Sequence, residues 1–146
     1  MIRIKNGQPH SAYPLPMSSP RQRYEKDQKE LIDLLRQVQD AKENGPDGAL
    51  RAFSAFRVKL ERLILYEESI LFPRFDRTKG LLREGPTAVM RVEHRQIRIL
   101  LNEIEEKLLK GDLKTDAEQI VLFEILRAHQ QQERIVVSPM IDRPPD

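Results

Sequence analysis

Apolar side chains recur along this chain in steps of three and four residues, the spacing that turns one face of an α-helix toward a core. Four such stretches are separated by short segments rich in Gly, Pro, Asn and Asp, and no stretch is a convincing strand. We therefore expect helices at about residues 20–43, 48–75, 86–110 and 115–138. Because the connections are short, consecutive helices should be antiparallel. The pattern predicts an all-α fold, an up-down-up-down antiparallel four-helix bundle.

Residue types at the expected helix ends support these bounds. Ser19 can cap the first helix, with Gln22 completing a capping box, and Thr115 with Glu118 offers the same arrangement for the fourth. Pro73 lies near the end of the second helix and predicts a kink or a stop there.

The remainder of the chain divides simply. Residues 1–18 are polar, contain three prolines and lack periodicity, so they are expected to form an extended N-terminal arm. Residues 19–142 should form the bundle and residues 143–146 a short tail. A length of 146 residues is typical of one domain.

Composition excludes several function classes. The chain has no cysteine, which excludes Cys-ligated zinc, an iron–sulfur cluster held by cysteines and a thiol nucleophile. Its 25 basic and 23 acidic residues give a net charge of +2, so no basic excess points to a nucleic-acid partner. No apolar run approaches the roughly 20 residues that cross a bilayer, and residues 1–20 lack the apolar segment of a signal peptide. We expect a cytoplasmic protein with no membrane partner.

A polar residue interrupts the apolar stripe of every helix. The expected core-facing positions are Tyr24, Gln28, Leu31, Leu35 and Val38; Phe53, Phe56, Leu60, Leu63, Glu67 and Ile70; Met90, His94, Ile97, Leu101, Ile104 and Leu108; and Leu122, Leu126, His129, Glu133 and Val136. Burying such a polar group costs several kcal/mol unless a partner satisfies it. Four helices with such an interruption require a common cause.

The interruptions fall at one level of the predicted bundle. Gln28 and His94 each follow their helix starts by about eight residues, whereas Glu67 and His129 precede their helix ends by about as many. At about 1.5 Å per residue, all four lie about 12 Å from the same end. Glu133 lies one turn nearer that end. Two imidazoles and two carboxylates suit Fe, Mn or Zn, although a metal-free layer of hydrogen-bonded His and Glu remains an alternative.

These residues resemble the hemerythrin-like, or HHE cation-binding, domain family. The resemblance covers about residues 20–142 and rests on the segments 67–73, 90–94 and 129–133. In the family pattern a proline follows each HxxxE motif six residues after its Glu, as Pro73 and Pro139 do here. The resemblance implies a non-heme di-iron bundle in which carboxylates matching Glu67 and Glu133 bridge the metals. His94 and His129 match histidines at one of those metals.

The sequence departs from the family pattern at two positions. Gln28 stands where the first helix usually has a histidine, and Leu63 stands where the HxxxE motif of the second helix has its histidine. Both lost histidines belong to the other metal. We therefore expect one metal ion, iron with Mn or Zn as alternatives, held by His94, His129, Glu67 and Glu133. Water would fill the remaining positions.

Three function classes follow from these residues. The first is a metal-binding bundle that senses, stores or scavenges iron, O2 or NO, without reversible O2 carriage. The second is a metal-free helical regulatory or interaction module. The third, an oxidative enzyme of the di-iron carboxylate type, is disfavoured because that class uses ExxH spacing.

Some residues near the predicted site are open to more than one interpretation. Tyr24 lies one turn from Gln28 and is expected mainly to pack in the core. Glu93 is expected to be solvated or to hydrogen-bond a ligand, and for Glu68 a contact to a ligand or the replacement of a missing ligand is the alternative to a place outside the site. Arg91, Arg95 and Arg98 are expected to form a solvated face, with a basic mouth for an anion as the alternative.

Overall fold

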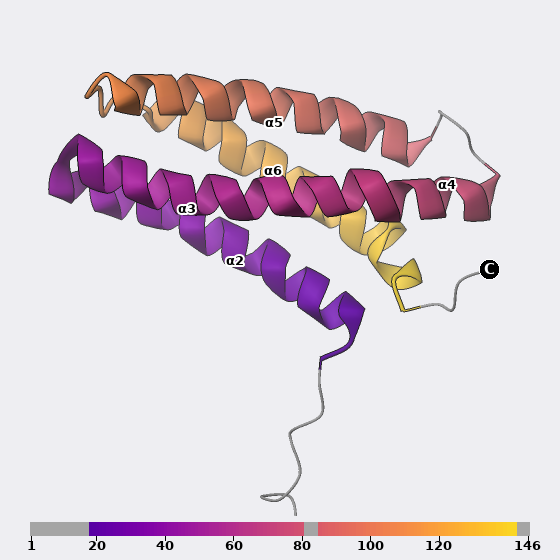
Figure 1. Ribbon diagram of the computed structural model, residues 1–146. Coiled ribbons are helices and arrows are strands. Elements are labelled where there is room, and N and C mark those ends of the chain that lie inside the picture. The colour runs from indigo at the N-terminus through magenta and orange to yellow at the C-terminus, as the bar shows by residue number, and fades with distance from the viewer. Residues whose placement is uncertain (1–17, 81–84, 143–146) are drawn as a thin grey trace, which may run out of the picture.

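The described part of the chain consists of helices joined by short connections (Figure 1). The computed structural model describes residues 18–80 and 85–142, and no residue in those ranges lies in a strand. The elements are α2 (Pro20–Ala41), the 3-10 turn η1 (Lys42–Asn44), α3 (Gly45–Tyr66), the π-helical turn η2 (Glu67–Leu71), α4 (Phe72–Lys79), α5 (Pro86–Leu109), α6 (Asp116–Val136) and the 3-10 turn η3 (Ser138–Met140). The prediction of an all-α fold is confirmed.

The predicted terminal segments fall mostly outside this part. Residues 1–17 and 143–146 are outside the described ranges. The N-terminal arm and the C-terminal tail therefore stay predictions. Within the described ranges, no helix is both long enough and apolar enough to cross a membrane.

The prediction of four separate helices needs a correction. Helical residues follow one another without a break from Pro20 to Lys79, so the first two predicted helices form one bent helical run. The bend lies at η1, where Gly45 adopts a φ of 80°, a left-handed conformation that glycine reaches at little cost. Figure 1 shows that α2 and α3 then lie side by side in opposite directions, as do α5 and α6.

One of the two predicted capping boxes is present. Ser19 and Gln22 exchange side-chain to backbone hydrogen bonds of 3.1 and 3.0 Å at the start of α2. At the start of α6 the predicted box is absent, because the Thr115 hydroxyl donates to the side chain of Gln119 at 2.6 Å. Glu118 instead pairs with Lys107 at 2.6 Å and ties α6 to α5.

The helix after α3 is widened into a π-turn just before Pro73. Proline has no N–H to donate, and its ring crowds the carbonyl four residues back, here that of Ser69. Within η2 the chain accommodates this with bonds to the fifth residue back, as when the Phe72 N–H donates to the Glu67 carbonyl. The kink or stop predicted at Pro73 is therefore a wide turn, and the helix continues to Lys79.

This turn changes which side chains face the core. A π-turn inserts one residue into the helical phase, so Leu71 is buried at 1% exposure while Ile70 is 53% exposed. The prediction that Ile70 faces the core is wrong for that reason. At the end of α6, Val137 is fully buried where the sequence pattern favoured Val136, which is only partly buried.

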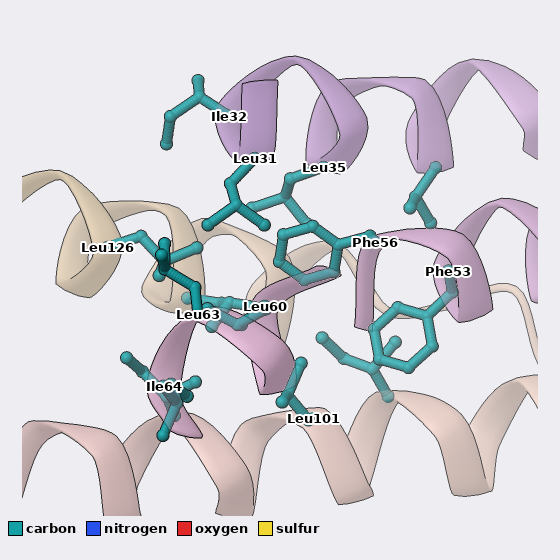
Figure 2. Packing of buried hydrophobic residues seen from close by; sticks show 14 of the residues in the cluster. Leu31, Ile32, Leu35, Phe53, Phe56, Leu60, Leu63, Ile64, Leu101 and Leu126 are labelled. Carbon is teal, nitrogen blue, oxygen red and sulfur yellow. The ribbon is translucent and has the colours of Figure 1, made fainter. Parts of the chain in front are cut away.

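The apolar core lies beside the level of the polar residues. Figure 2 shows side chains from the long helical segments meeting between them, among them Leu35 from α2, Phe56 and Leu60 from α3, Leu101 from α5 and Leu126 from α6. Several of these are fully buried. Close packing of this kind resists displacement, so it fixes how far apart the helices stand where the polar residues meet.

Candidate metal centre

The polar interruptions of three helical segments converge on one point. Glu67 comes from η2, His94 from α5, and His129 and Glu133 from α6. Each offers a donor atom, and these four atoms all lie within 4.8 Å of one another. None of the four residues is more than 4% exposed. These are the four residues that the sequence analysis predicted as ligands, and the structure brings them together.

The two imidazoles turn the same ring atom inward. The Nε2 atoms of His94 and His129 are 3.1 Å apart. Glu67 Oε1 lies between them, 2.9 Å from His94 Nε2 and 3.5 Å from His129 Nε2. Glu133 Oε2 lies 3.1 Å from His129 Nε2. Two nitrogens and two carboxylate oxygens therefore point into one small space.

The outward nitrogen of each imidazole is held by its own carboxylate. His94 Nδ1 donates to Glu68 Oε2 at 2.6 Å, and His129 Nδ1 donates to Glu93 Oε1 at 2.9 Å. In metal sites such a contact fixes the ring and leaves the Nε2 lone pair facing the ion. The His94 ring also stacks on Phe72, with centroids 5.5 Å apart.

Sequence reasoning named both carboxylates as candidates near the site but did not pair either of them with an imidazole. Glu93 precedes His94 and yet serves His129, a pairing across helices that one sequence does not reveal. Glu68 reaches the ring that its neighbour Glu67 also contacts, because both belong to the wide turn η2. Pro73 was the available signal for that turn.

Helix α2 supplies two hydrogen-bond donors to the cluster. The Tyr24 hydroxyl donates to Glu67 Oε2 at 2.6 Å, and the Gln28 amide nitrogen donates to Glu133 Oε1 at 2.5 Å. Gln130 in turn donates to the backbone carbonyl of Gln28 at 2.7 Å. Tyr24 was expected mainly to pack, but its hydroxyl is part of the cluster. Gln28 presents its N–H, and no amide oxygen, to the carboxylate.

The charges of the cluster shift its pKa values. Burial by itself would raise the pKa of Glu67, but hydrogen bonds from His129 and His94 outweigh it and hold that pKa below its usual range. Burial would likewise lower the pKa of His129, yet Glu67 and Glu93 raise it to about 9. Burial, reinforced by Glu67, raises the pKa of Tyr24 far above its usual value. Without a metal, His129 is therefore protonated at neutral pH.

One atom of the cluster has no hydrogen-bond partner. Glu133 Oε2 is buried, and although His129 Nε2 lies within ion-pairing distance, the two atoms do not have hydrogen-bond geometry. A buried carboxylate oxygen in this state costs free energy. A cation coordinated by this oxygen would remove that cost.

A small cavity adjoins the four donor atoms. Its volume is about 10 Å³, close to the minimum that one water molecule needs. Leu63, one of the two positions that depart from the family pattern, lines it and offers no ligand. Two imidazole nitrogens and two carboxylate oxygens are a donor set that suits Fe, Mn or Zn. The residues present therefore fit one ion.

Two of the three arginines near His94, Arg91 and Arg98, are engaged with neighbouring side chains. Arg91 lies 3.5 Å from Asp76 and over the ring of Phe72. Arg98 lies 3.2 Å from Glu61 and 3.9 Å from Glu68. These contacts favour the solvated, paired face over an open anion-binding mouth. His10, the remaining histidine, lies outside the described residues.

Comparisons with known proteins agree with the sequence resemblance. The hemerythrin HHE cation binding domain matches residues 20–141. The iron-sulfur cluster repair protein YtfE of Edwardsiella ictaluri is 33% identical over 74 residues, which is 51% of this chain and 34% of that protein. This chain thus aligns with about a third of that relative's length. No solved structure matches the chain significantly.

Proposed function

The chain belongs to the hemerythrin HHE cation-binding domain family, and from that premise we propose that it binds a single non-heme metal ion, iron, within an up-down-up-down bundle. The proposed ligands are His94, His129, Glu67 and Glu133. The observation that carries the proposal is the convergence of four buried donor atoms within 4.8 Å, with both outward imidazole nitrogens already held by carboxylates.

The proposal assigns separate tasks to the surrounding residues. Glu68 and Glu93 orient the imidazoles and raise their basicity. Leu31, Leu60 and Leu63 line the cavity and limit the entry of water. A bound ion would supply a Lewis-acidic and, as iron, redox-active centre. The roles we propose are sensing, storage or scavenging of iron, O2 or NO.

The choice of iron over Mn and Zn has one support outside the geometry. The relative from Edwardsiella ictaluri is named for the repair of iron–sulfur clusters, so its function concerns iron. The ligand atoms alone suit all three metals. Elemental analysis of protein purified without an affinity tag, with a visible absorption spectrum, distinguishes the three. We expect about one equivalent of iron per chain.

A metal-free regulatory or interaction module is the second candidate. It is favoured by the paired state of His129, whose contacts to Glu67 and Glu93 satisfy a protonated ring without any metal. The unpartnered Glu133 Oε2 argues against it. Metal at background level after anaerobic reconstitution with Fe(II) would contradict metal binding and support this second candidate.

A further inference from the structure

Each carboxylate of the cluster uses its two oxygens for different partners. Glu67 Oε1 faces the two imidazoles, while Oε2 accepts the Tyr24 hydroxyl. Glu133 Oε2 faces His129, while Oε1 accepts the Gln28 amide. In both residues the inward oxygen points toward the candidate ion and the outward oxygen toward α2.

The two α2 donors are held in place by the fold. Tyr24 and Gln28 lie one turn apart on α2 and are 3% and 4% exposed. The backbone carbonyl of Gln28 accepts a hydrogen bond from Gln130 on α6, and the Tyr24 ring packs against Tyr66 with centroids 6.3 Å apart. Burial of both side chains, on a helix whose backbone is bonded to α6, keeps each donor aimed at one acceptor.

The α2 side of the cluster therefore directs two hydrogen-bond donors at the carboxylates. A carboxylate oxygen that accepts a short O–H or N–H bond is less available to a cation. Leu63, on α3, adds an apolar wall beside the same cavity. A second ion on this side would have to break both hydrogen bonds, and Leu63 would offer it no ligand.

We propose that Tyr24 and Gln28 are positioning residues that make Glu67 and Glu133 one-oxygen ligands and restrict the site to a single ion. This inference rests on the proposed function. It adds that the selectivity for one ion resides in α2, in side chains that do not contact the ion. Because the two residues act on the ion only through the carboxylates, substituting them should change the metal affinity and the number of ligand atoms.

The test uses Co²⁺ added to metal-free full-length protein, with the visible spectrum as a report of the ligand number. The wild type should saturate at about one equivalent. Tyr24→Phe and Gln28→Met should each lower the Co²⁺ affinity roughly 10–100-fold and alter the visible bands. Matched controls are Tyr66→Phe, whose ring packs against Tyr24, and Gln131→Met on the exposed side of α6. Both controls should bind within about twofold of the wild type.

A second arm tests the restriction to one ion. Gln28→His with Leu63→His introduces ligands on the α2 and α3 side and should raise the metal content from about one towards two. Adding Tyr24→Phe should increase the uptake of the second equivalent further, because it frees Glu67 Oε2. If Gln28→Met fails to fold, Gln28→Asn replaces it, since the shorter amide cannot reach Glu133.

The outcomes separate the two proposals. Binding of one Co²⁺ by the wild type, with unchanged affinity and spectrum in Tyr24→Phe and Gln28→Met, would overturn the positioning role and leave the metal site standing. No Co²⁺ binding by the wild type would overturn the proposed function and this inference together. Weakened binding with altered bands in the two α2 variants and not in the controls supports both.

Discussion

The Nε2 atoms of His94 and His129 face each other at 3.1 Å inside the bundle. Two lone pairs at that distance repel, so either a proton or a cation must lie on this contact. The pKa of His129, raised to about 9, shows that the proton is retained at neutral pH when no metal is present. A metal ion and a proton therefore compete for the same nitrogen.

Chelation is expected to destabilise the native protein through this site. A ligand that binds only the folded state stabilises it by mass action, and removing it lowers the melting temperature by several degrees. Differential scanning calorimetry with and without a chelator measures the shift. His129→Ala should melt at the same temperature under both conditions. Identical melting of metal-loaded wild type with and without chelator would contradict the site.

The stability of metal-free protein should fall as pH rises. The folded-state pKa of His129, about 9, lies above its unfolded value of 6.5. The protonated ring therefore stabilises the folded state fully below about pH 6.5, and this stabilisation is lost between pH 6.5 and 9. A pKa shift of this size corresponds to about 3 kcal/mol of unfolding free energy. Urea unfolding of chelator-treated protein at pH 6, 7.5 and 9 measures it, and a His129→Gln variant should lack this slope.

Metal affinity should depend on the carboxylates behind the imidazoles. Glu68→Gln and Glu93→Gln each weaken the acceptor of an Nδ1–H bond and should lower the affinity roughly 10–100-fold. Glu61→Gln is the matched control, since Glu61 pairs with Arg98 and contacts neither imidazole. Competition with a chromophoric chelator gives the dissociation constants. Equal affinity in all three variants would show that the rings need no such support.

The π-turn predicts a contrast between two neighbouring residues. Leu71→Ala removes a side chain that is 1% exposed and should cost about 2–5 kcal/mol of unfolding free energy. Ile70→Ala alters a side chain that is 53% exposed and should cost well under half as much. Denaturant unfolding of the two variants compares them directly. The reverse order would mean that the segment is a regular α-helix.

Periodicity predicted most of the architecture and the convergence of the cluster. Glu67, His94 and His129 interrupt apolar stripes at one level, with Glu133 one turn nearer the end of the bundle, and the helical rise alone places them close together. The sequence predicts a break where η1 is only a bend, because Gly45 and Pro46 end helices more often than they join them. The prediction that Ile70 is buried is wrong because the helical period of 3.6 residues per turn does not hold across η2.

The hydrophobic pattern could not predict which side chains of different helices hydrogen-bond to each other. Tyr24 occupies an ordinary core position, and only the distance to Glu67 shows that its hydroxyl is used. Glu93 lies off the core-facing stripe, so its bond to His129 depends on how α5 and α6 are rotated against each other. Such rotations follow from side-chain packing along whole helices, which one sequence does not display.

The wide turn η2 contains one residue more than the same stretch of regular α-helix would, and the helix accommodates it without forming a loop. If the same residues formed a regular α-helix in place of this wide turn, the segment that follows would be rotated by about 100° around the helix axis. Phe72 would then turn away from His94, and Asp76 from Thr87, with which it now hydrogen-bonds at 2.6 Å. The number of residues from Glu67 to Pro73 therefore determines how the cluster and the packing of α4 on α5 are placed relative to each other.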